Sequence, residues 1–203
     1  MIRVPLLSRA GQWALLSAVG MWVVAIGIGR AAFEVDLSPV FPPTKIVVVE
    51  VCVMVTATLL AIVTRPRFWE WDRVARRARA RVLAGVVAVV VIGCAVLCVP
   101  VLVPWLPPGT AWGWVLANAV VLGAFVVLLA PFVSALFAGG ITLVLWFCAA
   151  IVANLAPAVW LPLAYYRGHD PSWGVAIGLA VCAVAVHVRT YGMTAWAHRQ
   201  FER

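Results

Sequence analysis

The run VLAGVVAVVVIGCAVLCVPVLV, from Val82 to Val103, decides the fold, because it is uncharged and long enough to cross a bilayer. A transmembrane helix needs about 20 consecutive apolar residues. The segment before it, RPRFWEWDRVARRARAR from Arg65 to Arg81, carries seven arginines. An uncharged run beside a dense cationic segment predicts a membrane-spanning helix whose arginines stay at the membrane surface.

The same character extends over the chain of 203 residues, of which 66% are hydrophobic and 11% are charged. Soluble domains average about half apolar and about a quarter charged residues, so this chain has too little polar surface to cover a water-soluble core. Backbone groups in hydrocarbon must bond internally, which restricts spanning segments to helices or closed barrels. The apolar runs lack the alternation of barrel strands. The sequence therefore predicts an all-α membrane protein.

The apolar runs divide the chain into about six helices within one predicted transmembrane domain. The predicted spans cover residues 13–29, 44–64, 82–103, 111–130, 134–156 and 173–188. The first span is predicted to be a signal anchor, because no small-residue cleavage site of the usual kind follows it. Ala31–Pro43 is predicted to be a loop, and Pro157–Ser172 a broken, aromatic segment on the outer side. Pro131 and the pair Gly139–Gly140 are alternative positions for the turn between the fourth and fifth spans.

Cationic residues are distributed unevenly between the two sets of loops that six spans create. Lysine and arginine in short loops stay on the cytoplasmic side. The set that includes both chain ends and the basic loop 65–81 holds twelve cations, whereas the other holds Arg30, Lys45 and Arg167. Both termini are therefore predicted to be cytoplasmic, with the bundle in the plasma membrane. The net charge of +8 is assigned to these loops and to anionic headgroups, not to nucleic acid.

Catalytic and nucleotide-binding signatures are absent, so we predict that the chain is not itself an enzyme. It contains no G-x-x-x-x-G-K-[ST], no H-E-x-x-H and no G-x-S-x-G. The histidines His169, His187 and His198 are too scattered to hold a haem between two of them. No cofactor or metal is predicted for this chain, and the five cysteines, all in apolar runs, are interpreted as small hydrophobic residues.

Three polar residues inside predicted spans, Glu50, Asn118 and Asn154, are candidates for a translocation path. A charge inside a bilayer is costly and usually faces a cavity or a partner. Glu50 therefore either belongs to a translocation path or proton relay, or lies near the outer interface, where it is protonated or pairs with Lys45 or Arg30. The two amides either form interhelical hydrogen bonds or contact a substrate.

The basic loop has two interpretations. It is either a surface anchor on anionic lipid, or an interfacial helix that couples the bundle to a cytoplasmic partner. Lipid binding explains its arginines, but it does not require the acidic residues beside them. For the coupling interpretation, the predicted contact residues are Phe68, Trp69, Glu70, Trp71, Asp72, Arg73, Arg76 and Arg77.

In its layout the chain resembles the membrane subunit of an ABC-2-type exporter. Those permeases have six spans with both ends inside, an amphipathic lead-in, a second–third connection that touches the ATPase, and a broken segment before the sixth span. Here Ile2–Gln12, Arg65–Arg81 and Pro157–Ser172 correspond to these parts. The resemblance covers the whole chain through topology and not through a motif, and the chain is short for that family. It implies a separate ATP-binding subunit that carries ATP and Mg²⁺, and a second permease copy or homologue.

These features predict a permease subunit of an ATP-driven exporter that moves a hydrophobic or peptide-like compound across the plasma membrane. One alternative is a non-transporting anchor or immunity subunit of a membrane complex. Another is a small secondary transporter or intramembrane enzyme that works through Glu50. The composition, rich in alanine, valine, arginine and tryptophan with one lysine, is typical of a GC-rich bacterial genome.

Overall fold

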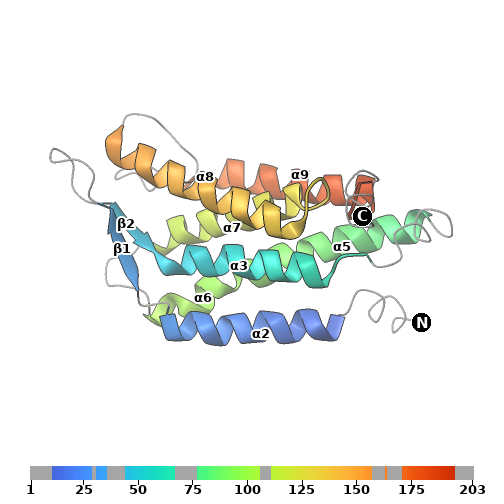
Figure 1. The fold of residues 1–203 in the computed structure, drawn as a ribbon, viewed down its shortest axis with the longest axis horizontal. Coiled ribbons are helices and arrows are strands. Elements are labelled where there is room, and N and C mark those ends of the chain that lie inside the picture. The colour runs from blue at the N-terminus through green and yellow to red at the C-terminus, as the bar shows by residue number, and fades with distance from the viewer. Residues whose placement is uncertain are drawn as a thin grey trace.

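The computed structural model describes residues 11–28, 31–35, 44–66, 77–105, 111–156, 163 and 171–194. Within them the chain forms a bundle of six helical segments aligned along one axis (Figure 1). The helices are α2 (Gly11–Ile28), α3 (Val48–Val63), α5 (Arg77–Val96) continued by α6 (Cys98–Leu102), α7 (Trp112–Leu129), α8 (Ala135–Leu155) and α9 (Trp173–Thr190). A short 3-10 turn, η1 (Val103–Trp105), follows α6.

Four of these segments are long and apolar enough to cross a membrane, namely Ala78–Leu102, Trp112–Leu129, Ala135–Leu155 and Trp173–Thr190. The remaining two, α2 and α3, are apolar but shorter. At a rise of about 1.5 Å per residue, the 16 residues of α3 extend about 24 Å. The structure thus confirms a helical protein with six helices, four of them candidate membrane spans.

The predicted loop at Ala31–Pro43 is wrong in its first part, and the second predicted span, residues 44–64, starts too early. Ala32–Val35 forms strand β1, which pairs antiparallel with β2, Thr44–Val47, so α3 begins at Val48 and not at Thr44. Valine, isoleucine and threonine favour extended backbone, and three of the four β2 residues are of these types. The register pairs Ala32 with Val47, Phe33 with Ile46, Glu34 with Lys45, and Val35 with Thr44.

The third helical segment begins earlier than predicted, at Arg77, so the end of the predicted basic loop 65–81 is helical. Alanine and arginine are strong helix formers, and no glycine or proline interrupts the RARAR sequence at this point. The same segment is interrupted at Leu97, between α5 and α6. Pro100 explains this break, because it has no N–H for the carbonyl of Val96.

The turn between α7 and α8 lies at Pro131 and not at Gly139–Gly140. The side chain of Ser134 caps the first turn of α8. Gly139 lies within α8, where an added Cβ would collide with the Oγ1 of Thr58 on α3 and lie 2.9 Å from its Cγ2. The helices α3 and α8 therefore approach closely because this residue has no side chain.

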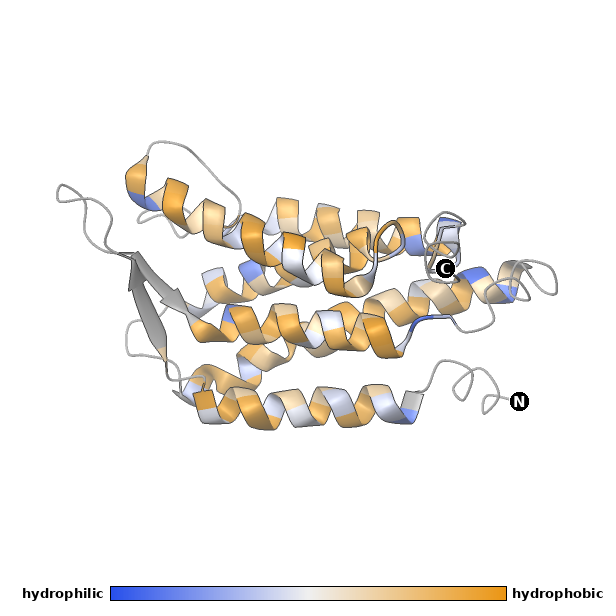
Figure 2. Cartoon of the chain, viewed as in Figure 1, coloured by the Kyte–Doolittle hydropathy of each residue, from blue (hydrophilic) through white to orange (hydrophobic). Residues whose placement is uncertain are grey.

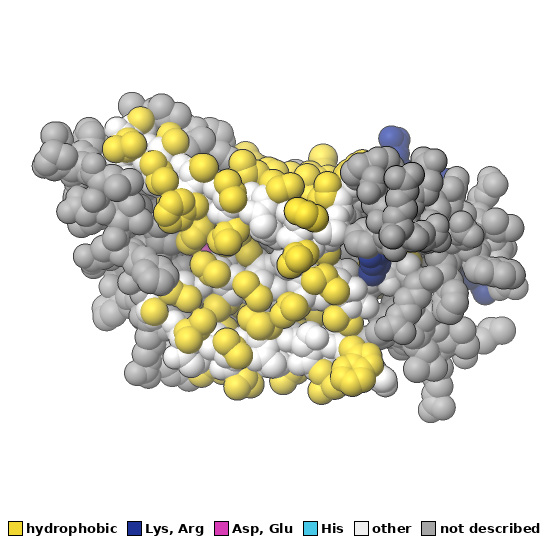
Figure 3. Space-filling model, in the orientation of Figure 1, with side chains coloured by type: hydrophobic (Ala, Val, Ile, Leu, Met, Phe, Trp, Pro, Cys, Tyr) yellow, Lys and Arg dark blue, Asp and Glu magenta, His cyan; other side chains and the backbone are white. Residues whose placement is uncertain are grey.

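The helix α7 lies at the centre of the bundle, packed against α3, α5, α8 and α9, whereas α2 packs at the edge against α3 and α6. The outward faces are as apolar as the core: Val82, Leu136 and Phe137 are 66%, 69% and 70% exposed. Figure 2 shows hydrophobic residues along every helix, and Figure 3 shows them covering the face in view. Continuous apolar surface of this extent suits hydrocarbon and not water. The protein is thus built as a multi-pass membrane protein.

The described arginine side chains gather at one end of the bundle. Arg65, Arg79, Arg81 and Arg189 lie where α3 ends, α5 begins and α9 ends. The helix α2 also begins at this end, and β1 and β2 lie at the opposite one (Figure 1). Figure 3 shows the Lys and Arg side chains of the described residues at this end of the face in view. We call the two ends the basic end and the hairpin end.

Candidate functional site

The described helices contain one acidic residue, Glu50, which lies in the first turn of α3 and is 6% exposed. Because α3 begins at Val48, Glu50 is the third residue of the helix and lies nearer its start than the sequence predicts. The first turn of a helix carries backbone N–H groups without intrahelical partners and the positive end of the helix dipole. This position therefore stabilises a carboxylate better than one further along the span.

Two donors from other helices hold the carboxyl group of Glu50. Asn118 on α7 donates from Nδ2 to Oε1 at 2.9 Å, and Trp146 on α8 donates from Nε1 to Oε2. Asn118 and Trp146 are 4% and 6% exposed. Each carboxyl oxygen thus accepts a hydrogen bond from a different helix, and one polar group joins α3, α7 and α8. We call Glu50, Asn118 and Trp146 the Glu50 cluster.

The amide of Asn118 has two further features. Its Nδ2 also donates to the backbone oxygen of Leu163 at 3.4 Å. Leu163 belongs to the predicted outer segment Pro157–Ser172, and its side chain packs against the main apolar core. The Oδ1 of Asn118 is buried and has no hydrogen-bond partner among the described residues. A buried acceptor of this kind favours a place for a water molecule or for a donor group of a ligand.

The structure brings two of the three predicted path residues, Glu50 and Asn118, into direct contact. Asn154 is buried in α8 at 2% exposure, about 12 Å along the helix from Trp146. Two cations, Arg30 and Lys45, are predicted as alternative partners of Glu50. The structure describes neither Arg30 nor the side chain of Lys45.

Sequence reasoning misses Trp146, although a recognisable signal is present. A tryptophan in the middle of an apolar span carries an indole N–H that needs an acceptor in a dry environment. Trp22, in the middle of α2, follows the same rule, because its Nε1 donates to the backbone oxygen of Cys94 at 3.1 Å. Tryptophans inside the spans thus mark places where a polar acceptor lies.

The predicted coupling residues lie mostly outside the described part of the chain. Residues 67–76 include Phe68, Trp69, Glu70, Trp71, Asp72, Arg73 and Arg76 and are not described. Arg77 begins α5, and Arg65 follows the end of α3. The connection between these helices therefore starts and ends at the basic end.

A metal centre has no support in the described residues, where no three histidine, cysteine, aspartate or glutamate side chains come together in a way that could hold an ion. Comparison of the chain with protein-family models, with curated proteins and with solved structures finds no match. The fold and the site therefore define a class: a helical multi-pass membrane protein with a buried carboxyl group held between three helices.

Proposed function

We propose that the chain is the membrane-spanning permease subunit of an ATP-driven exporter in the plasma membrane. It works with a separate ATP-binding subunit and with a second permease copy or homologue. The observation that carries this proposal is the arrangement at the basic end, where α2 begins, α9 ends and the α3–α5 connection starts and ends. In the proposed topology all six helices cross the bilayer and the basic end faces the cytoplasm.

The proposed coupling follows from the position of α5. The arginine-rich segment that contains the predicted contact residues 68–77 leads directly into this helix of 20 residues. A packed helix moves as a rigid element, and α5 contacts both α7 and α9 inside the bundle. A displacement of the segment by an ATPase would therefore reach the centre of the bundle through α5. The sequence contains no P-loop motif, so in this proposal the energy comes from the partner.

A substrate path between two permease copies would be lined by surfaces such as those of α2 and α8. Both helices present exposed large apolar side chains, among them Leu16 and Val23 on α2 and Val144 on α8. Apolar walls favour apolar cargo, because polar groups that leave water there would lack partners. This supports a hydrophobic or peptide-like compound as the exported substrate.

Replacing Trp69, Glu70, Trp71 and Asp72 together by alanine is expected to weaken the association with the ATPase by about 30-fold or more. One buried aromatic residue in an interface is often worth about 2 kcal/mol, and two tryptophans are removed. The measurement is a detergent pull-down of the tagged chain from its native membranes, followed by mass spectrometry and an assay of ATP hydrolysis.

The matched control is Arg79→Ala, which removes a nearby exposed cation and leaves the four residues in place. It should retain the ATPase. If the wild-type chain purifies in a complex without a nucleotide-hydrolysing component, the exporter proposal is wrong, and a non-transporting anchor subunit takes its place.

A second function, a small secondary transporter working through Glu50, is favoured by one observation: the unpartnered Oδ1 of Asn118 lies on the side chain that holds the carboxyl group. In this alternative, proteoliposomes with the wild-type chain dissipate an imposed pH gradient, and Glu50→Gln slows this at least about tenfold, because proton relays depend on the ionisable group. The control is Thr142→Ala, a change at a buried polar residue outside the predicted path. Equal rates for wild type and Glu50→Gln would rule the alternative out.

A further inference from the structure

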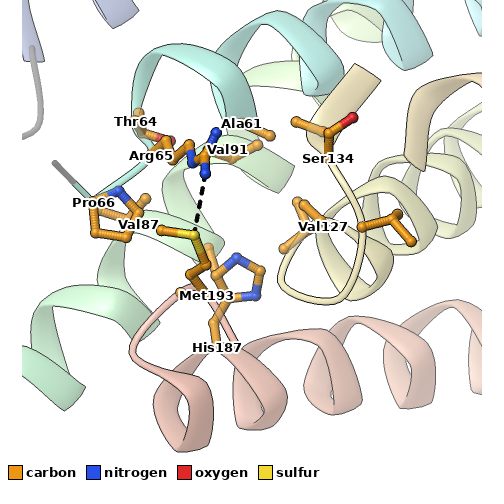
Figure 4. A pocket seen from close by; sticks show the side chains of 15 residues that line it. Ala61, Thr64, Arg65, Pro66, Val87, Val91, Val127, Ser134, His187 and Met193 are labelled. Carbon is orange, nitrogen blue, oxygen red and sulfur yellow. Dashed lines mark hydrogen bonds between the residues drawn. The ribbon is translucent and has the colours of Figure 1, made fainter. Parts of the chain in front are cut away.

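The described residues bring polar groups from several helices together in two places. One is a pocket of about 40 Å³ at the basic end, whose lining includes Arg65 and His187 (Figure 4). The carbonyl-bearing ends of α3, α7 and α9 meet there, and a cation beside such ends stabilises helices. The other place is the Glu50 cluster at the hairpin end, where the Oδ1 of Asn118 has no donor among the described residues.

The hydrogen bonds of the Glu50 cluster fit an ionised carboxyl group, which can only accept. Its Oε1 accepts from the Nδ2 of Asn118 at 2.9 Å, and its Oε2 accepts from the Nε1 of Trp146. The Nδ2 of Asn118 also donates to the backbone oxygen of Leu163 at 3.4 Å. The amide N–H2 group thus has two acceptors, while the oxygen of the same amide has no described partner.

A proton on this carboxyl group changes the partners that it needs. An indole N–H can only donate, so Oε2 remains the acceptor of Trp146 and the proton belongs on Oε1, where it meets the N–H of Asn118. A half-turn of the amide about its terminal torsion, which is soft, exchanges Nδ2 and Oδ1 within the same space. Oδ1 then accepts from the carboxylic acid, and the backbone oxygen of Leu163 loses its donor.

Glu50 meets no other charge among the described side chains. The helices α2, α7 and α8, which pack against α3, carry no charged residue, and the arginines of α5 lie at the basic end. On the hairpin, Glu34 is the register partner of Lys45, and the side chains of both lie outside the described part of the chain. The thiols on α3 and on the helices packed against it are those of Cys52, Cys94, Cys98 and Cys148. None of them acts on the carboxyl group.

We propose that Glu50 and Asn118 form a proton-sensitive switch that holds or releases the chain at residue 163. When Glu50 is ionised, Asn118 bonds both the carboxylate and the backbone oxygen of Leu163. When Oε1 takes up a proton, the amide turns and residue 163 is released from α7. Because the two states exclude each other, attachment of residue 163 and binding of the proton oppose each other by the same factor. The inference does not depend on the exporter function.

Labelling of a cysteine at residue 163 tests the switch. In the purified full chain in detergent, with the five native cysteines replaced by alanine, Leu163→Cys keeps the backbone oxygen that Asn118 bonds. Its rate with a maleimide is divided by the rate of glutathione at the same pH, which cancels the change in thiolate fraction. This ratio should rise about threefold or more between about pH 8 and about pH 5, because a hydrogen bond that holds the residue is lost.

Three variants in this background separate the switch from general loosening in acid. Glu50→Gln offers an N–H2 group to Oδ1 at every pH, so its ratio should be high already at about pH 8 and should not change. Asn118→Leu removes the donor to residue 163 and should behave in the same way, which guards against loss of folding in Glu50→Gln. Thr142→Ala, a change at another buried polar residue, should respond like its parent.

Circular dichroism establishes which of these variants are folded. The proposal is overturned if the ratio of the parent chain stays constant with pH. It is equally overturned if a folded Glu50→Gln or Asn118→Leu chain keeps the pH response, or if it labels as slowly as the parent at about pH 8.

Discussion

Replacing Trp146 by phenylalanine is expected to lower the free energy of unfolding by about 1–3 kcal/mol, the range for leaving a buried hydrogen-bonding group without its partner. The variant keeps most of the apolar ring and removes the N–H that Glu50 accepts. Asn118→Leu is expected to cost a similar amount, because it removes the donor to the other carboxyl oxygen. Glu50 is 6% exposed, so water replaces neither bond. Reversible unfolding in detergent micelles, followed by circular dichroism, measures both effects.

A double-mutant cycle attributes these losses to the carboxyl group. In a Glu50→Leu background, Trp146→Phe and Asn118→Leu should each cost clearly less than in the wild type, since no carboxyl oxygen is left there without a donor. Trp22→Phe is the matched control, because Trp22 donates to the backbone oxygen of Cys94 and its cost should be the same in both backgrounds. If Trp146→Phe costs as much without Glu50 as with it, the hydrogen bond is not what joins α8 to α3.

The second large effect is expected for Gly139→Ala, which should destabilise the protein by about 1–3 kcal/mol through overpacking. The new Cβ would meet the Oγ1, Cγ2 and Cβ of Thr58. Thr58 is fixed in turn, because its Oγ1 donates to the backbone oxygen of Met54 at 2.7 Å. The two helices must therefore move apart, which also disturbs the contact between Glu50 and Trp146. Thermal unfolding in micelles measures the loss.

Gly140→Ala is the matched control, since a Cβ there meets nothing within 4 Å. The adjacent alanine should leave stability unchanged or raise it slightly, because alanine favours helix. Adding Thr58→Ala to Gly139→Ala removes the two side-chain atoms nearest to the new Cβ and should recover part of the loss. Equal effects at residues 139 and 140 would show that α3 and α8 do not pack as described.

The helices could be predicted because the length of each apolar run is enough to indicate a membrane-spanning helix. The helices α7, α8 and α9 begin and end within two residues of the predicted bounds. The start of α3 could not be predicted in the same way. Ile46 and Val47 continue into the apolar run of the helix that follows. The pairing of Thr44–Val47 with Ala32–Val35 is a contact between segments that hydropathy does not report.

In the candidate site, too, single residues could be predicted from the sequence, whereas their contacts could not. Glu50 and Asn118 could be found because polar residues are conspicuous in apolar spans, but their pairing depends on the way α3 and α7 pack. In the sequence, Trp146 looks like a lipid-facing aromatic residue. Only the need of its indole N–H for an acceptor indicates that it lies inside the bundle. The pocket lined by Arg65 and His187 lies between four helix ends and one face of α5, and no local sequence pattern encodes such packing.

Cysteine labelling in intact cells tests the proposed topology most directly. In a chain whose five cysteines are replaced by alanine, Arg76→Cys should resist a membrane-impermeant maleimide until the cells are opened. Ser38→Cys and Gly109→Cys, in two of the three connections at the hairpin end, should react in intact cells. Labelling of Arg76→Cys from outside, with Ser38→Cys and Gly109→Cys protected, would show that the basic end is extracellular and would contradict the cytoplasmic coupling built on it.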